Sequence, residues 1–229
     1  MKPYTWLLFD ADGTLLDFDL AERTALTETL AEYGITADES MLAVYSRIND
    51  AIWKQSEVGT FDRDQLNQVR FSRFAAEYGF VYDPEQVGET YFAHMARQNQ
   101  LIDGALELCR ALQEFYSLAI ITNGTAFIQH SRLDNTPLLA CMQHLFISQE
   151  VGAEKPSPAF FDVVAAAIPD FDRSRALVIG DSLTSDIAGG IAAGIDTCWY
   201  NPHGKAAPAD RMPTYTVRNY NDLRTLLQI

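Results

Sequence analysis

Five short runs of apolar residues, separated for the most part by helical segments, constrain the fold of this 229-residue chain more than any other feature. The runs lie at Tyr4–Phe9, Ser117–Ile121, Leu145–Ser148, Ala176–Ile179 and Thr197–Tyr200. Short apolar runs without polar alternation are typical of strands that are buried on both faces of a parallel sheet. Because helices alternate with them, the sequence predicts an α/β fold with a Rossmann-like parallel sheet.

The stretch between the first two predicted strands breaks this alternation, because its pattern is helical throughout. Asp19 and Glu22 have the spacing of a capping box, and Gly34 stands where the first helix would stop. Further helices are predicted from about Asp38 to Gln55, from near Asp62, and from Asp83-Pro84 onward. About 80 residues are too many for a simple connection. We therefore predict an inserted helical cap domain at residues 17–99 and a core domain at residues 1–16 and 100–229.

Small polar and acidic residues follow three of the predicted strands. The first strand runs into DADGT (residues 10–14), the second into TNG (122–124) and the fourth into GDSLTSD (180–186). Ligands of open parallel sheets bind at the carboxyl ends of the strands. A single Asp-Gly pair is most often only a turn. Three such motifs at three strand ends favour one shared binding site.

Four aspartates, Asp10, Asp12, Asp181 and Asp186, would converge on this site. Like charges in a partly dry site repel one another, so the cluster needs protons or a cation. Oxygen donors without His or Cys favour Mg²⁺. The alternative is a set of solvated helix caps. It is strongest for Asp186, which could sit in the first turn of a helix that starts near Thr184.

Lys155 lies in GAEKPSP (residues 152–158), just before a helix predicted at Ala159–Ile168. Ser157 and Pro158 resemble the cap and the first position of that helix. A lone loop lysine is usually solvated. A carboxylate can attack a phosphate only when the negative charges of both groups are offset, however, so we assign Lys155 to the site.

FDADGT, ITNGT, EKPSPAFF and GDSLTSD, in this order and at these separations, resemble the four motifs of the haloacid dehalogenase (HAD) superfamily. The resemblance covers the whole chain and implies the HAD fold with a helical cap between the first and second motifs. The longer stretches FDADGTLLDFDLAE and GDSLTSDIAGGIAAGIDTCWYNP are similar to the HAD-type pyrimidine 5′-nucleotidases. That similarity implies a phosphatase for nucleoside monophosphates such as dUMP, UMP and dTMP.

The resemblance also implies the roles of three side chains. Asp10 would be the nucleophile that forms an aspartyl-phosphate intermediate. Asp12 would protonate the leaving oxygen and later deprotonate water. Lys155 would pair with Asp10 and with the phosphoryl group. In an extended segment, residues two apart face the same way, so Asp10 and Asp12 can address one phosphate.

The remaining site residues are assigned to metal and phosphate by the same resemblance. Mg²⁺ would be held by Asp10, the backbone carbonyl of Asp12, and Asp181, with Asp186 as a direct or indirect ligand. Thr122 and backbone N–H groups near Asn123 and Gly124 would hydrogen-bond the phosphoryl oxygens. The expected reaction is an in-line phosphoryl transfer.

Two other readings stay open. Asp12 disfavours dehalogenation, because a halide leaves without a proton, but a phosphatase or phosphomutase for a small sugar or acid phosphate would keep the same core motifs. A non-catalytic metal- or nucleotide-binding scaffold would not require both Asp10 and Asp12.

The cap should select the leaving group, and its polar or aromatic candidates are Asn49, Trp53, Arg70, Phe71, Arg73 and His94. Most such side chains pack in a core or face solvent.

The net charge of the chain limits the kinds of molecule that it is expected to bind. Seventeen Lys and Arg against 31 Asp and Glu give a net charge of −14, which argues against nucleic-acid polymers and anionic membranes. A single phosphate monoester needs only a local reversal of sign, so a small-molecule substrate is expected. Three cysteines without a C-x-x-C pair, and an N-terminus without a signal-like apolar run, predict a reduced, cytoplasmic protein.

Overall fold

The computed structural model describes residues 4–57 and 65–229, which form two compact units, one of residues up to 17 with 99–229 and one of residues 18–98. The first unit contains a parallel sheet in the order β3-β2-β1-β4-β5-β6. Its strands are β1 (Trp6–Phe9), β2 (Ser117–Thr122), β3 (His144–Ile147), β4 (Ala176–Gly180), β5 (Asp196–Tyr200) and β6 (Tyr215–Val217). The prediction of a parallel α/β sheet is confirmed, and five strands fall on the five apolar runs.

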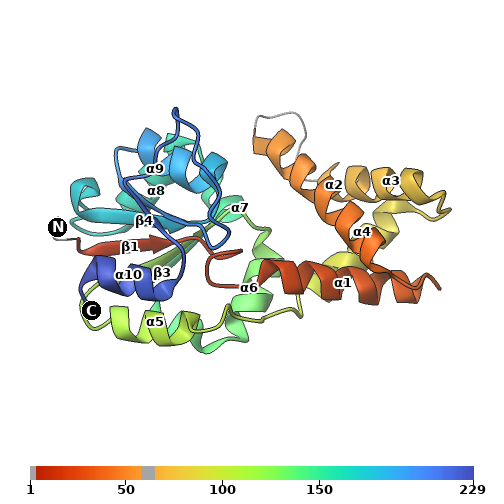
Figure 1. The fold of residues 1–229 in the computed structure, drawn as a ribbon, viewed down its shortest axis with the longest axis horizontal. Coiled ribbons are helices and arrows are strands. Elements are labelled where there is room, and N and C mark those ends of the chain that lie inside the picture. Colours follow the sequence, from red (N-terminus) through yellow and green to blue (C-terminus); the bar gives the residue numbers. More distant parts are fainter. Residues whose placement is uncertain (1–3, 58–64) are drawn as a thin grey trace. The chain divides into compact units, whose positions relative to one another are not determined.

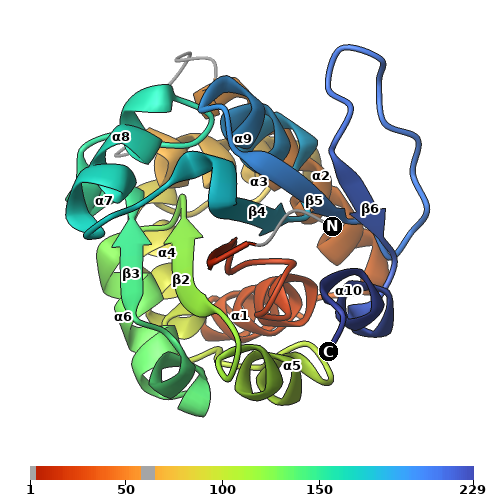
Figure 2. The ribbon, with the colours of Figure 1, turned by 90° about the vertical axis from the view of Figure 1, so that its left-hand side faces the viewer.

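Helices cover both faces of this sheet. Figures 1 and 2 show α5 and α10 along one face and α8 and α9 along the other. The helices of this unit are α5 (Ala105–Leu112), α6 (Ala126–Asp134), α7 (Ser148–Val151), α8 (Pro158–Ala167), α9 (Ala188–Ala192) and α10 (Tyr220–Leu227). Shorter helical turns are η2 (Pro137–Cys141), η3 (Arg173–Arg175) and η4 (Leu183–Ile187).

Strand β1 shows why the apolar runs lack polar alternation. Leu7 and Phe9 belong to the buried cluster that includes Leu108 of α5, whereas Leu8 belongs to the opposite cluster with Phe160 and Phe161 of α8. Successive side chains of a strand point to opposite faces, and both faces of this sheet are covered. Every position of the strand therefore has to be apolar.

One strand was missed, and the ends of the five predicted strands differ from the structure by one or two residues. β6 was not predicted, because three residues at the sheet edge, paired only with β5, are too short to show a pattern. The predicted third strand extends one residue too far, since Ser148 begins α7, where its carbonyl accepts the N–H of Gly152.

The second unit is helical, as its pattern predicts. It comprises α1 (Phe18–Glu32), α2 (Glu39–Glu57), α3 (Leu66–Tyr78) and α4 (Pro84–Met95). Its centre is aromatic: the ring of Tyr45 lies 5.5 Å from those of Phe71 and Tyr91 and 5.6 Å from that of Phe74, between ring centroids. Aromatic pairs at these separations contribute stability beyond their buried area. Across residues 4–57 and 65–229, no helix is long and apolar enough to cross a membrane.

Two of the predicted helix starts in this unit are confirmed by hydrogen bonds. Asp38 accepts the backbone N–H of Met41 at 2.8 Å, just ahead of α2. Asp83 accepts that of Glu85 at 3.0 Å at the start of α4, with Pro84 in the first turn. The predicted start near Asp62 lies outside the described residues.

The capping box predicted for α1 is wrong. The helix begins at Phe18, so Asp19 lies inside its first turn. Glu22 is buried, and its carboxylate accepts a hydrogen bond of 2.5 Å from the Asn49 side chain of α2. A buried carboxylate needs such a donor, and this interhelical bond takes the place of the expected local one.

Candidate active site

The strand order brings the polar motifs together. β1 lies between β2 and β4, and Phe9 at the end of β1 pairs in register with Ile120 and Ile179. The residues that follow these three strands therefore emerge side by side at the carboxyl edge of the sheet. Asp10 comes from β1, Thr122 ends β2, and Asp181 follows β4.

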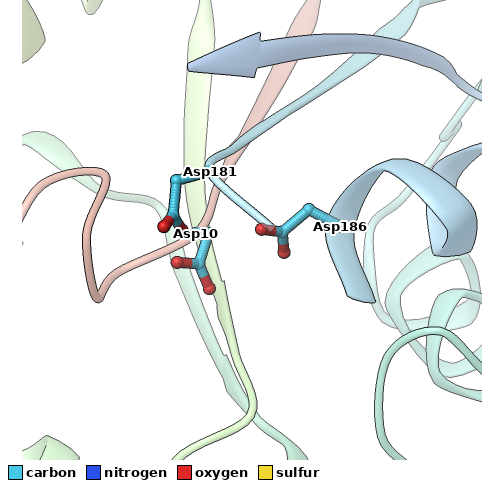
Figure 3. Close-up of side chains that lie close together, drawn as sticks. All are labelled: Asp10, Asp181 and Asp186. Atoms are coloured by element: carbon cyan, nitrogen blue, oxygen red, sulfur yellow. The ribbon is translucent and has the colours of Figure 1, made fainter. Parts of the chain in front are cut away.

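Asp10, Asp181 and Asp186 form a carboxylate cluster at this edge (Figure 3). Each offers an oxygen, and these three oxygens lie within 4.8 Å of one another. Asp10 and Asp186 are buried, at 7% and 0% exposure, whereas Asp181 is exposed. The alternative interpretation of Asp186 as a solvated helix cap is therefore wrong, because its side chain is completely buried.

Lys155 is inserted among the buried carboxylates. Its ammonium Nζ donates to Asp10 Oδ1 and Asp186 Oδ1, both at 2.6 Å, and to the Ile121 carbonyl at 2.8 Å. The side chain is only 1% exposed. All three donors of the ammonium are therefore used. Burial alone would lower the pKa of Lys155, but the Asp10 and Asp186 carboxylates outweigh it and hold this pKa above its usual value.

One ammonium does not neutralise three carboxylates. Burial, followed by the charge of Asp186, raises the pKa of Asp10 well above its usual value, and Lys155 only partly opposes this. Asp181 is an exposed residue, but protein atoms surround its carboxyl group and partly remove it from water. This desolvation, followed by the negative charge of Asp186, raises the pKa of Asp181 to about 7. The cluster is therefore deficient in positive charge.

Two glycines allow the close approach of these aspartates. Gly13 has φ +76°, and a Cβ there would lie 2.7 Å from an oxygen of Asp181. A Cβ on Gly180 would overlap the carboxylate of Asp186. The glycines of the first and fourth motifs therefore provide the space that the cluster occupies.

Gly180→Ala is expected to lower the free energy of unfolding by about 1–3 kcal/mol, because the added methyl group collides with Asp186 in a closely packed site. Urea denaturation measures the change. The matched control is the same substitution in an Asp186→Gly background, where the collision partner is missing and the cost should shrink. Equal costs in both backgrounds would contradict this origin of the strain.

Asn123 holds the Lys155 loop in place. Its Nδ2 donates to the Lys155 carbonyl at 2.7 Å, and its Oδ1 accepts the Lys155 backbone N–H at 2.9 Å. The second and third motifs are thus joined by two hydrogen bonds. Both polar atoms of the Asn123 side chain are bonded to the backbone of Lys155. The backbone N–H groups of Asn123 and Gly124 remain the predicted phosphate donors at these two residues.

Asp12 lies beside the cluster and is bound by two side chains of α6. Arg132 Nη1 donates to Asp12 Oδ1 at 2.5 Å, and Gln129 Nε2 donates to Asp12 Oδ2 at 2.7 Å. Gln129 Nε2 also donates to Thr122 Oγ1 at 2.9 Å. Neither Gln129 nor Arg132 was predicted from the sequence. The available signal was a polar pair spaced i, i+3 on the helix face that also carries buried Leu133.

Four of the six polar and aromatic candidates of the helical unit are buried in its packing, whereas Trp53 and Arg73 are only partly buried. Asn49, Arg70, Phe71 and His94 are buried within this unit. His94 lies between two glutamates of α1, with Nε2 at 2.7 Å from Glu32 and Nδ1 at 2.8 Å from Glu28. These side chains contribute to the helix packing of the unit to which they belong.

Comparison with known proteins yields relatives along the full length of the chain. The chain is 40% identical over 221 residues to the pyrimidine 5′-nucleotidase PynA of Streptococcus pneumoniae, covering 96% of this chain and 93% of the relative. It is 35% identical to the pyrimidine 5′-nucleotidase YjjG of Escherichia coli, covering 98% of each. The solved structure of the magnesium-bound HAD-hydrolase YfnB of Bacillus subtilis matches with a TM-score of 0.96 at 39% identity, over 100% of both chains.

These likenesses confirm the resemblance carried by the four motifs. The model of the haloacid dehalogenase-like hydrolases matches residues 4–194, which include all the motif residues and the helical unit. The chain belongs to the haloacid dehalogenase-like hydrolase family, and it is an enzyme of that family.

Proposed function

We propose that the enzyme is a Mg²⁺-dependent phosphatase that hydrolyses nucleoside 5′-monophosphates, with pyrimidine nucleotides such as dUMP, UMP and dTMP preferred. The observation that carries the proposal is the buried Asp10–Lys155 pair beside Asp181 and Asp186 at the sheet edge. The two relatives named as pyrimidine 5′-nucleotidases, 40% and 35% identical, support the substrate class.

The donor set of the cluster fits Mg²⁺. It consists only of oxygens, which magnesium prefers, and its carboxylates outnumber the one ammonium that neutralises them. Asp10, Asp181 and Asp186 would hold the ion, together with the backbone carbonyl of Asp12. When bound, the ion would offset the charge of Asp10 and of the phosphoryl oxygens as they approach each other.

The reaction proceeds in two transfers. An Asp10 carboxylate oxygen attacks phosphorus, the P–O5′ bond breaks, and Asp12 gives its proton to the leaving 5′ oxygen. The nucleoside departs and leaves an aspartyl-phosphate. Asp12, now a carboxylate, takes a proton from water, and the resulting hydroxide oxygen bonds to phosphorus as the Asp10–phosphorus bond breaks. Inorganic phosphate and the original Asp10 result.

The other residues hold the phosphoryl group during both transfers. Lys155 Nζ, 2.6 Å from Asp10 Oδ1, aligns the attacking carboxylate and offers positive charge to the phosphoryl oxygens. The Thr122 hydroxyl and the backbone N–H groups of Asn123 and Gly124 donate to those oxygens. Donors fixed in advance are effective because they need no rearrangement when charge develops.

The proposed substrate is a small molecule, and the proposed setting is the cytoplasm. A charge of −14 favours a single phosphate over a polyanion, because only the local field of Lys155 and the metal has to be positive. Cys109, Cys141 and Cys198 are buried and free, which supports a reducing compartment.

A substrate panel tests this function. With Mg²⁺, kcat/KM for dUMP, UMP and dTMP is expected to exceed that for purine nucleotides and sugar phosphates, and EDTA is expected to abolish turnover of all of them, including p-nitrophenyl phosphate. Equal rates across the panel would refute the pyrimidine preference. A sugar phosphate as the best substrate would favour the sugar phosphatase or mutase, and no metal-dependent turnover of any ester would favour a non-catalytic scaffold.

A further inference from the structure

Asp12 has an environment unlike that of the other aspartates of the site. Its two carboxylate oxygens are bound by different side chains, Oδ1 by Arg132 at 2.5 Å and Oδ2 by Gln129 at 2.7 Å. Asp12 retains 27% side-chain exposure, whereas Arg132 and Gln129 are almost completely buried, at 1% and 2%. A partly exposed carboxyl group thus accepts hydrogen bonds from two buried side chains.

Gln129 ties this arrangement to the loop assigned to phosphate. Its Nε2 also donates to the Thr122 hydroxyl at 2.9 Å. The backbone of Gly124 lies so close to Gln129 that a Cβ at Gly124 would overlap the Gln129 side chain. The orientation of the Asp12 carboxyl group therefore depends on the same contacts that shape residues 122–124.

Stability alone gives little reason to bury Arg132. Taking a guanidinium and a carboxylate out of water costs about as much as their attraction returns, so a buried ion pair is weak evidence for a stabilising role. A planar guanidinium does fix the direction of its partner, because its donors diverge at set angles. A proton donor needs that direction, since it must lie within hydrogen-bond reach of the leaving oxygen.

We propose that Arg132 and Gln129 are positioning residues, which hold the Asp12 carboxyl group in the orientation that lets it protonate the leaving oxygen. The inference rests on the proposed function, in which Asp12 is the proton donor. It assigns to α6 a task in leaving-group departure, in addition to the contact of Gln129 with Thr122 in the loop assigned to phosphate.

The test uses two esters that differ in their need for a proton. The 5′ oxygen of UMP must be protonated as it leaves, whereas p-nitrophenolate leaves as a stable anion. The value of kcat/KM covers steps up to release of the leaving group and omits hydrolysis of the aspartyl-phosphate. Arg132→Met and Gln129→Met are each expected to lower the ratio of kcat/KM for UMP to that for p-nitrophenyl phosphate by about tenfold, part of the usual contribution of a general acid.

Three comparisons separate positioning from loss of structure. Arg132→Lys retains a donor and should restore part of the ratio, and circular dichroism checks the folding of every variant. Arg173→Met removes another 2.5 Å Arg–Asp pair, that with Asp162, which is far more exposed, and should leave the ratio unchanged. In an Asp12→Asn background, Arg132→Met should no longer change the ratio, because both substitutions act on one proton transfer.

The outcomes separate this inference from the proposed function. A wild-type enzyme without metal-dependent turnover of either ester contradicts the proposed function itself. An active wild type whose Arg132→Met and Gln129→Met variants keep the wild-type ratio, or lose both activities in proportion, overturns the positioning role and leaves the phosphatase in place. If Arg132→Met does not fold, Gln129→Met and Arg132→Lys decide.

Discussion

Asp10→Asn is expected to reduce kcat for every phosphate ester by roughly 10⁴-fold or more, because an amide cannot form the aspartyl-phosphate. The fold should persist, since Asn keeps an oxygen that can accept the hydrogen bond from Lys155 Nζ. The substitution also removes one charge from a cluster that is deficient in positive charge. The thermal midpoint is therefore expected to stay the same or to rise.

Three measurements check this expectation. Steady-state kinetics give the loss of kcat, and acid quenching followed by mass spectrometry should detect a phosphorylated wild-type enzyme but no phosphorylated variant. Asp162→Asn is the control, because Asp162 is an exposed aspartate of α8 whose carboxylate pairs with Arg173. Near-full turnover by Asp10→Asn with an intact fold would show that another group is the nucleophile.

The sheet and the meeting of its motifs could be predicted because the necessary information is local. A strand buried on both faces has to be a continuous apolar run, and the residue after Phe9, Thr122 or Gly180 stands at a carboxyl end by necessity. Once the sheet is parallel, all these ends share one edge. The positions of Asp10 and Asp181 thus follow from the positions of the strands.

Most side-chain partners could not be derived from the residues themselves, because they depend on contacts between distant segments. The pairing of Lys155 with Asp10 was expected only from the family resemblance. Arg132 and Asp12 are 120 positions apart, and Lys155 and Asp10 are 145 apart. Glu22 shows how a local rule fails when such a contact competes, since its bond to Asn49 replaces the expected capping box. The position of Asp186 differs from these cases, because the space for its carboxylate is provided by Gly180 of the same motif.

Lys155→Met is expected to abolish turnover and, in EDTA, to lower the free energy of unfolding by about 3–5 kcal/mol, because Asp10 and Asp186 lose their buried cationic partner. Without the ammonium, the pKa of Asp10, already raised, rises further. The folded variant then binds protons that the unfolded chain at the same pH does not bind. Stability of the variant should therefore fall as pH rises, with a deficit smaller near about pH 5 than near about pH 8.

Urea denaturation of the metal-free proteins at both pH values measures this deficit, and added Mg²⁺ should recover part of it by supplying the missing positive charge. Lys205→Met is the matched control, because Lys205 is exposed and its loss should change stability by less than about 0.5 kcal/mol. A deficit that is independent of pH and of Mg²⁺ would mean that Lys155 contributes packing alone. A deficit that grows with pH and shrinks with Mg²⁺ identifies charge balance as the reason for burying a lysine among three aspartates.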